Sequence, residues 1–357
     1  MKPSELKQAL YYATMAYRPI MLWGAPGIGK SKIVYQVAEK LLPKSLVDNR
    51  SGRLLKRQGI GRKVSEFRAT LLDPVDLRGL MEITGTNGKR RTVWCPPIFL
   101  PSSPGGLLFI DELPTAPPLV QAALYQLILD GRLGEYVLPE DTVIVCAGNM
   151  EGHRAAVNRM PTPLANRFIH LYLEIDNAEW IDWAIEMDLA IEVIAFIRFR
   201  PALLSTFDPS NLEKAFASPR TWEFASDIVK QNPPKNILIH LLRGTIGKGP
   251  AEELYSFLED WKDLPDPVKL LKNPESAEIP TKPSVMFAVI QALAKIVDKN
   301  TMANFLLYAN RLQNNGKMEF AMAMVTDAIT RDPSLKNTKV YIEGWLTKHT
   351  NLYVRTH

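Results

Sequence analysis

The stretch Gly24-Ala-Pro-Gly-Ile-Gly-Lys-Ser31 decides the fold, because it fits the pattern G-x-x-x-x-G-K-[ST] of a phosphate-binding loop. It lies between an apolar run at residues 19–23, which predicts a buried strand, and an amphipathic pattern at residues 30–42, which predicts a helix. Glycines let backbone N–H groups close around phosphate oxygens, and the following helix start presents unpaired donors and a positive dipole end. The alternative, a glycine-rich turn that binds nothing, is disfavoured by this strand–loop–helix context.

A second motif, Leu107-Leu-Phe-Ile-Asp-Glu112, predicts a buried strand that ends in two carboxylates. We expect Asp111 to bind Mg²⁺ together with the Ser31 hydroxyl, and Glu112 to polarise the attacking water as a general base. The alternative is a solvated loop start or a helix cap, which the spacing from the phosphate loop disfavours. The expected ligands are ATP and Mg²⁺. The candidate nucleotide-binding residues are Gly24, Ala25, Pro26, Gly27, Ile28, Gly29, Lys30, Ser31 and Asp111.

Three further polar residues are candidates for the same chemistry. Asn149 follows a predicted strand at residues 142–147 and would hold the water or the γ-phosphate, unless it only caps a turn. Arg167 would stabilise phosphoryl charge in the site of an adjacent subunit. A surface salt bridge is the rival explanation for Arg167, and Arg159 is a second candidate for this role. Arg220 begins a helix after Ser218-Pro219 and would contact the γ-phosphate from the second half of the chain.

The organisation of the chain changes near residue 176. Before it, short apolar runs at residues 64–72, 107–110, 142–147 and 169–175 alternate with helical patterns, as in a parallel α/β sheet. After it, strand signals disappear. The predicted fold class is therefore an α/β nucleotide-binding core followed by an all-helical lid. The expected segments are the core at 1–176, the lid at 177–263, an extended proline-rich connector at 264–284 and a final helical part at 285–357.

Two basic segments interrupt the core. Asn87-Gly88 predicts a hairpin at about residues 80–96, with Lys89, Arg90 and Arg91 at its tip. These side chains would grip a partner in the channel of a ring, or they are ordinary surface charges. The stretch at residues 44–63 is either a flexible insertion or an anion-binding face, and the sequence does not decide between them.

Composition excludes several other classes. The 357 residues are 46% hydrophobic with a net charge of +5, which neither demands nor forbids an acidic partner. Cys95 and Cys146 form no C-x-x-C pair, so a disulfide framework and a cysteine zinc site are not expected. The first residues lack the apolar segment of a signal peptide, and the longest apolar stretch contains Gln291 and Lys295. These features predict a cytoplasmic protein with no membrane partner.

In their order and spacing, these motifs resemble an AAA+ module, and more narrowly the MoxR family with its phage-encoded members. The matching stretches are DPVDLRGL at 73–80, GGLLFIDELPTAPPLVQAALYQLI at 105–128, PLANRF at 163–168 and ASPRTWEF at 217–224. The resemblance implies Walker A and B motifs, sensor 1 at Asn149, an arginine finger at Arg167 and sensor 2 at Arg220. It also identifies the hairpin as the helix-2 insert and residues 132–139 as a short hairpin before sensor 1.

The resemblance implies a hexameric ring that remodels or matures a client protein. Family partners often carry a von Willebrand factor A domain; this chain lacks the D-x-S-x-S motif, so such a partner would be a separate protein. Two features depart from the family: Asn166 stands where aspartate is usual before the finger, and the proline-rich segment lengthens the lid. We expect ATP to bind between core and lid, with the ring closed by a repeated head-to-tail interface.

Two other functions remain open from the sequence. A nucleic-acid motor or loader would use the basic segments, although few aromatic residues are interleaved with them. A nucleotide switch that assembles on ATP without hydrolysing it would not need both Asp111 and Glu112.

Overall fold

The computed structural model describes residues 1–40, 46–47, 54–55, 64–85, 90–150, 160–211, 213–262 and 264–349. The chain forms two compact units. The core unit comprises Met1–Ile175 with Asp208–Leu212, and the helical unit comprises Asp176–Phe207 with Glu213–His357.

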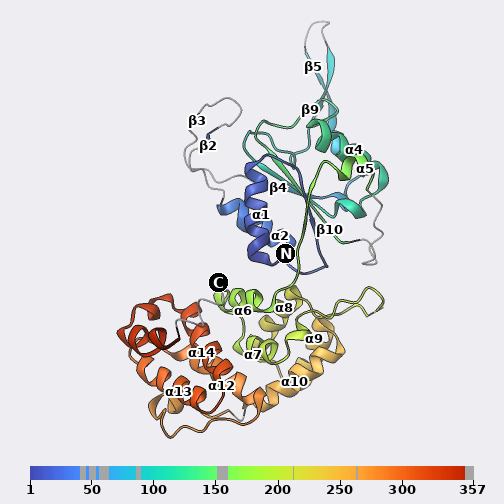
Figure 1. Ribbon diagram of the computed structural model, residues 1–357. Helices are drawn as coiled ribbons and strands as arrows, with labels where there is room; N and C mark the ends of the chain where they lie inside the picture. Colours follow the sequence, from blue (N-terminus) through green and yellow to red (C-terminus); the bar gives the residue numbers. More distant parts are fainter. Residues whose placement is uncertain are drawn as a thin grey trace. The chain divides into compact units, whose positions relative to one another are not determined.

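The core unit is built on a parallel five-stranded sheet (Figure 1). Its strand order is β11-β1-β10-β7-β4. The strands are β1 (Ile20–Trp23), β4 (Val64–Arg68), β7 (Leu107–Asp111), β10 (Val143–Gly148) and β11 (Ile169–Tyr172). Every residue of β10 is buried, and in β7 only the final aspartate is not, because helices cover both faces of the sheet. The predicted fold class is confirmed: an α/β core with a parallel sheet is followed by a helical carboxy-terminal part.

Alternate residues of the strands face two separate hydrophobic clusters, as the twofold period of a strand requires. Ile20 and Leu22 pack with α1 (Pro3–Met15) and α2 (Lys30–Lys40) on one face, whereas Met21 faces α4 (Pro118–Asp130) on the other. The apolar pattern of residues 118–130 predicts a helix, and α4 has those bounds. Helix α1 was not predicted, although its buried Leu6 and Leu10 have the i, i+4 spacing of a helix face.

Two strands end earlier than predicted. Strand β4 was expected to reach residue 72, but it ends at Arg68, and a 3-10 turn, η1 (Ala69–Leu71), follows. Strand β11 was expected to reach residue 175 and ends at Tyr172. Because β4 ends early, the chain turns at the edge of the sheet. Thr70 therefore lies beside the end of the neighbouring strand, β7. For the predicted helix 30–42, the described part ends at Lys40.

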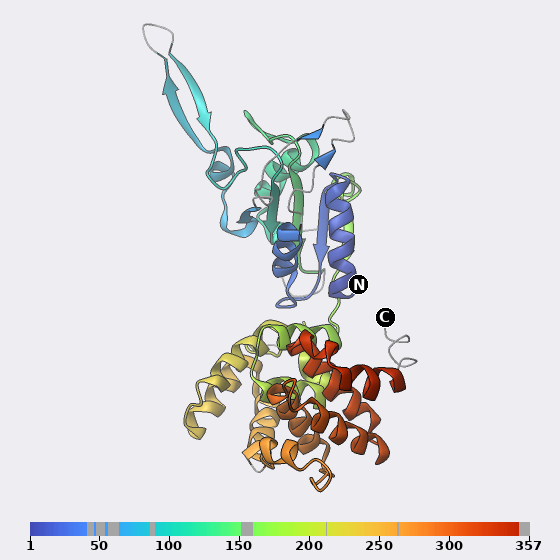
Figure 2. The ribbon, with the colours of Figure 1, turned by 90° about the vertical axis from the view of Figure 1, so that its left-hand side faces the viewer.

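The predicted insert is a two-stranded antiparallel hairpin of β5 (Leu80–Thr84) and β6 (Arg91–Cys95), which extends away from the sheet (Figures 1 and 2). Its base requires glycine: Gly79 has a φ of 81°, and a Cβ there would lie 1.9 Å from the Cys95 carbonyl oxygen. The predicted Asn87-Gly88 turn, Lys89 and most of the basic stretch 44–63 lie outside the described residues. A second hairpin, β8 (Arg132–Leu133) with β9 (Tyr136–Val137), occupies the position expected for residues 132–139.

The described part of the helical unit contains helices and no strand. Its helices are α6 (Asn177–Glu186), α7 (Ile191–Phe199), α8 (Pro219–Lys230), α9 (Lys235–Ile246), α10 (Lys248–Lys262), α11 (Pro267–Lys272), α12 (Pro283–Ile296), α13 (Met302–Asn314), α14 (Met318–Arg331) and α15 (Lys339–Tyr341). Helix α12 is central, since it packs against both α7 and α14.

The proline-rich segment is not the extended connector that its composition predicts. It contains α11, whose Leu270 and Leu271 are buried in the helical core. Its later carbonyl groups accept hydrogen bonds from α13: the Tyr308 hydroxyl donates to Glu278 O at 3.1 Å, and Arg311 Nη1 donates to Ala277 O at 2.8 Å. Because proline removes N–H donors and leaves the carbonyl groups, such a segment is readily fixed by donors from a neighbouring helix.

A buried polar group lies inside the helical unit, and we call it the Asp327 cluster. Asp327 on α14 is fully buried and accepts hydrogen bonds from Arg198 of α7 and Gln291 of α12. Burial raises the pKa of Asp327 to about 6, an effect that the charge of Arg198 and the bond from Gln291 oppose. This cluster therefore joins three helices through charged and amide groups rather than apolar contacts.

Candidate active site

The candidate site lies at the carboxyl edge of the five-stranded sheet. Trp23, the last residue of β1, pairs with Gly148 of β10, and Arg68 of β4 pairs with Asp111 of β7. Because the strands are parallel, the residues that follow β1, β4, β7 and β10 meet at this one edge, where ligands bind in open α/β sheets. The structure thus brings the phosphate-binding loop, Asp111, Glu112 and Asn149 together.

The loop between β1 and α2 has the backbone of an anion cradle. Gly27 and Gly29 have φ values of 76° and 96°, which place them in the conformations that only glycine adopts easily. Ile28 between them is buried and fixes the loop to the core. Helix α2 then begins at Lys30, so its first unpaired N–H groups face the loop.

Lys30 is half-buried and crosses the loop. Its Nζ donates to the carbonyl oxygens of Gly24 at 2.8 Å and Ala25 at 3.0 Å, and to Asn149 Oδ1 at 3.0 Å. These three acceptors are uncharged and orient the ammonium group, whose charge also acts on Asp111. A phosphate oxygen can replace such acceptors with a gain in Coulomb energy.

Ser31 and Asp111 fit a magnesium ion. The Ser31 hydroxyl donates to Asp111 Oδ2 at 3.3 Å, so a hydroxyl and a carboxylate oxygen lie side by side at the loop. Hard oxygen donors of this kind, completed by phosphate oxygens and water, are what Mg²⁺ prefers. Burial raises the pKa of Asp111, while the backbone N–H of Glu112, the charge of Lys30 and the Ser31 hydroxyl oppose the shift. A divalent cation would favour its ionised form.

Glu112 has an unusual backbone and a specific side-chain partner. Its φ and ψ of 59° and 28° are left-handed, and its N–H donates to Asp111 Oδ1 at 2.9 Å. Its Oε2 accepts from the Thr70 hydroxyl at 2.5 Å. Sequence reasoning missed Thr70, and the available signal was a hydroxyl shortly after the strand that neighbours β7.

Arg167 lies on the surface, in the turn between α5 (Thr162–Ala165) and β11. Two backbone bonds close this turn: Arg167 N donates to Leu164 O at 2.9 Å, and Phe168 N donates to Ala165 O at 3.2 Å. The side chain of Arg167 is exposed. That is the position an arginine needs if it acts on a neighbouring molecule. The other candidate, Arg159, lies outside the described residues.

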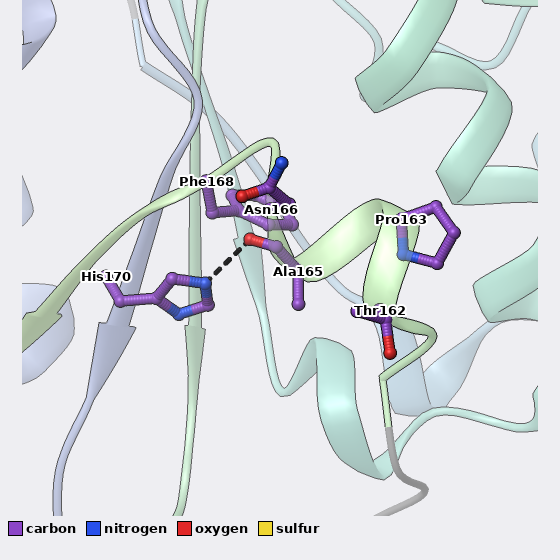
Figure 3. A pocket seen from close by; sticks show the side chains of 6 residues that line it. All are labelled: Thr162, Pro163, Ala165, Asn166, Phe168 and His170. Atoms are coloured by element: carbon purple, nitrogen blue, oxygen red, sulfur yellow. Dashed lines mark hydrogen bonds between the residues drawn. The ribbon is translucent and has the colours of Figure 1, made fainter.

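A pocket of about 530 Å³ opens beside this turn (Figure 3). It is lined by Thr162, Pro163, Ala165, Asn166, Phe168 and His170. His170 forms one wall, and its Nε2 lies 2.8 Å from Ala165 O. Sequence reasoning did not single out this histidine.

Arg220 belongs to the helical unit, where it is exposed in the first turn of α8. Ser218 caps this helix, because its Oγ accepts from Thr221 N at 3.3 Å, and Pro219 occupies the first helical position. The local structure therefore presents Arg220 at a fixed helix start, and its role toward a nucleotide stays a prediction.

Comparison with known proteins finds distant likenesses. No family model matches the chain. A midasin from Giardia intestinalis is 26% identical over 194 residues, which are 51% of this chain and 4% of the midasin. This chain thus corresponds to a small fraction of that relative. None of the described helices is long and apolar enough to cross a membrane.

Two solved structures illustrate the likeness of fold. RuvB from Thermotoga maritima, a Holliday junction branch migration motor, is 19% identical, with 88% of this chain and 86% of that chain covered and a TM-score of 0.37. NtrX from Brucella abortus in complex with ADP is 14% identical, with 98% and 68% covered and a TM-score of 0.35. These are likenesses of fold alone, and the narrower MoxR resemblance stays a prediction.

Proposed function

We propose that this chain hydrolyses ATP at the carboxyl edge of its sheet, as one subunit of a ring. The observation that carries the proposal is a pair of hydrogen bonds, from Lys30 to Asn149 and from Ser31 to Asp111. They join the phosphate-binding loop to the ends of two other strands, β10 and β7. A loop that served only as a turn would not require polar side chains from three strand ends at one place.

The loop would bind the triphosphate through its N–H groups and the start of α2. Lys30 would exchange its carbonyl and amide acceptors for β- and γ-phosphate oxygens. Ser31 and Asp111 would hold Mg²⁺, which supplies neutralisation of the phosphate charge when bound. Asn149, released by Lys30, would orient the water or a γ-phosphate oxygen.

Glu112 would act as the general base. Its carboxylate would accept the proton of the attacking water as the new phosphorus–oxygen bond forms and the bond to the β-phosphate oxygen breaks. The hydrogen bond from Thr70 holds Oε2, so Oε1 is the oxygen that we assign to the water.

The ring follows from the exposure of Arg167. We assign this arginine to the site of the next subunit, and a head-to-tail interface of that kind closes into a ring, here a hexamer. The projecting hairpin with Arg90 and Arg91 would contact a client protein, in the manner of a MoxR-type remodelling ATPase. A separate protein with a von Willebrand factor A domain is the candidate partner, and Arg220 would report the nucleotide state to the helical unit.

The test combines two variants that fail for different reasons. Glu112→Gln should keep ATP binding and lose about 100- to 1,000-fold in turnover, because only the base is removed. Arg167→Ala should be comparably inactive alone. Mixed rings of equal parts should recover about one quarter of wild-type activity, since Glu112→Gln subunits supply the arginine to intact sites of their neighbours.

Arg243→Ala is the matched control, because Arg243 is an exposed arginine paired with Glu252 in the helical unit. It should hydrolyse ATP like the wild type. Normal turnover by Glu112→Gln would show that the general base is misassigned. Hydrolysis stimulated by DNA or RNA would instead favour the nucleic-acid motor, and the protein that copurifies with Glu112→Gln would identify the client.

A further inference from the structure

Trp23 and His170 join the strand before the phosphate-binding loop to the strand after Arg167. Trp23 Nε1 donates to His170 Nδ1 at 2.8 Å, and the two rings are nearly coplanar, with an interplanar angle of 10° and centroids 6.1 Å apart. Since Nδ1 accepts this bond, the ring proton is assigned to Nε2. That nitrogen donates to Ala165 O at 2.8 Å, the bond drawn in Figure 3.

At one end of this link is the nucleotide loop. Trp23 directly precedes Gly24, and Trp23 O accepts from Leu173 N at 2.8 Å. Gly24 is closely packed as well: a Cβ there would lie 3.2 Å from Leu173 O and 2.5 Å from Ile28 Cδ1. The first residue of the loop therefore cannot shift without moving Trp23 or the end of β11.

At the other end is the turn that presents Arg167. Ala165 O accepts both from His170 Nε2 and from Phe168 N, so it anchors the turn from inside the core unit. The pocket beside the turn leaves room for movement on that side. Because α5 has only four residues, the backbone of this turn sets the point from which the exposed Arg167 side chain extends.

We propose that Trp23 and His170 are positioning residues, through which the nucleotide loop of one subunit sets the place of the Arg167 that it offers to the next. Nucleotide in the loop would hold Trp23, and through His170 also Ala165 O, more firmly than the loop does alone. The arginine would then be presented more often in its productive place. This inference rests on the proposed function, since it needs Arg167 to act in the neighbouring site.

Two substitutions of His170 distinguish the effect of its two hydrogen bonds from the effect of its packing. The side-chain amide of His170→Gln offers an acceptor to Trp23 and a donor to Ala165, whereas His170→Phe keeps a ring and has neither. His170→Phe should lower turnover about tenfold, the effect of losing a hydrogen bond from a half-buried site, and His170→Gln should lower it less than about twofold. His170→Gln should bind ATP like the wild type, whereas His170→Phe should bind it more weakly, by no more than the factor by which an occupied loop favours the link.

The decisive experiment mixes Arg167→Ala subunits with donors of the arginine. A Glu112→Gln donor, whose loop fills with ATP, should restore activity at least about fivefold better than a Lys30→Ala donor, whose loop stays empty. Adding His170→Phe to the Glu112→Gln donor should reduce restoration to the Lys30→Ala level, and adding His170→Gln should not.

Equal restoration by the Glu112→Gln and Lys30→Ala donors would overturn the link, as would full restoration by the donor that carries His170→Phe. Failure of the proposed function has a different signature. In that case the Glu112→Gln donor with an intact His170 restores nothing.

Discussion

Polar and charged side chains gather both at the carboxyl edge of the sheet and in the Asp327 cluster. The two regions differ in whether a ligand can replace the partners of these side chains. At the sheet edge, Lys30 donates to two backbone carbonyl oxygens and to Asn149, which a ligand can replace, and its charge also acts on Asp111. In the cluster, Asp327 is fully buried and its charge is opposed by Arg198, so nothing from outside can take the place of either. Side chains whose hydrogen-bond partners a ligand can replace therefore indicate a binding site. Side chains that are buried together with their partners indicate structural support.

The largest expected effect is on stability, from Asp327→Ala. This change removes the hydrogen-bonded partner of Arg198 and leaves it the weaker interaction with Asp182, which should cost about 3 kcal/mol in the free energy of unfolding. Hydrogen exchange of α12 and α14 measures the loss. Asp188→Ala is the control, because Asp188 is 71% exposed and its ion pairs are 3.8 Å long. Unchanged hydrogen exchange of α12 and α14 in Asp327→Ala would mean that the Asp327 cluster does not support the fold, and the two regions would then not differ in this respect.

Next in size is the loss of nucleotide binding in Lys30→Ala. Binding should weaken at least about 100-fold, or about 2.7 kcal/mol, since the charge that meets the phosphates is gone. Thermal unfolding should hardly change, because the former acceptors are neutral. Calorimetric titration with ATP and a melting curve give both values, with Lys40→Ala as the control at the exposed end of α2. A large loss of stability here would mean that Lys30 supports the fold instead.

A smaller effect is expected in the pH dependence of the free energy of unfolding. The pKa of Asp327 is raised from 3.8 to about 6 in the folded protein, so the folded state takes up a proton that the unfolded chain does not. Its contribution therefore favours folding more as pH falls through 6, and the advantage is lost as pH rises above it. From pH 7 to pH 5 the wild type should gain about 1 kcal/mol relative to Asp327→Asn. A constant difference between the two proteins would contradict the burial of an ionisable group.

The smallest effect is expected for Thr70→Val, which removes the hydroxyl bound to Glu112 and keeps the shape of the side chain. Freed from this bond, either oxygen of the carboxylate can accept the proton of the water, so basal ATP turnover should rise about threefold. Thr70→Ser keeps the hydroxyl and should behave like the wild type. Steady-state measurement of ATP turnover tests this expectation. A lower rate in Thr70→Val would mean that the hydroxyl orients Glu112 toward the water.

Much of the core was predictable because it depends on local patterns. Apolar runs gave β1, β7 and β10, and parallel strands must end at one edge, so the meeting of Lys30 with Asn149 needed no knowledge of exact register. Thr70 and His170 depended on register and on where β4 stops, which apolar patterns do not determine. The bond between Arg198 and Asp327 joins residues 129 positions apart, and neither helix pattern names the other as its partner. The prediction of an extended connector was wrong for the proline-rich segment, because hydrogen-bond donors on α13 hold this segment and its own composition does not reveal them.

The backbone at Glu112 carries a consequence for how this site can evolve. A side chain other than glycine in the left-handed region costs about 1–2 kcal/mol, so the fold itself would prefer glycine where the proposed mechanism needs a carboxylate. Changing Glu112 to glycine would therefore make the fold more stable and would remove the proposed base, so stability and turnover favour different residues at this position.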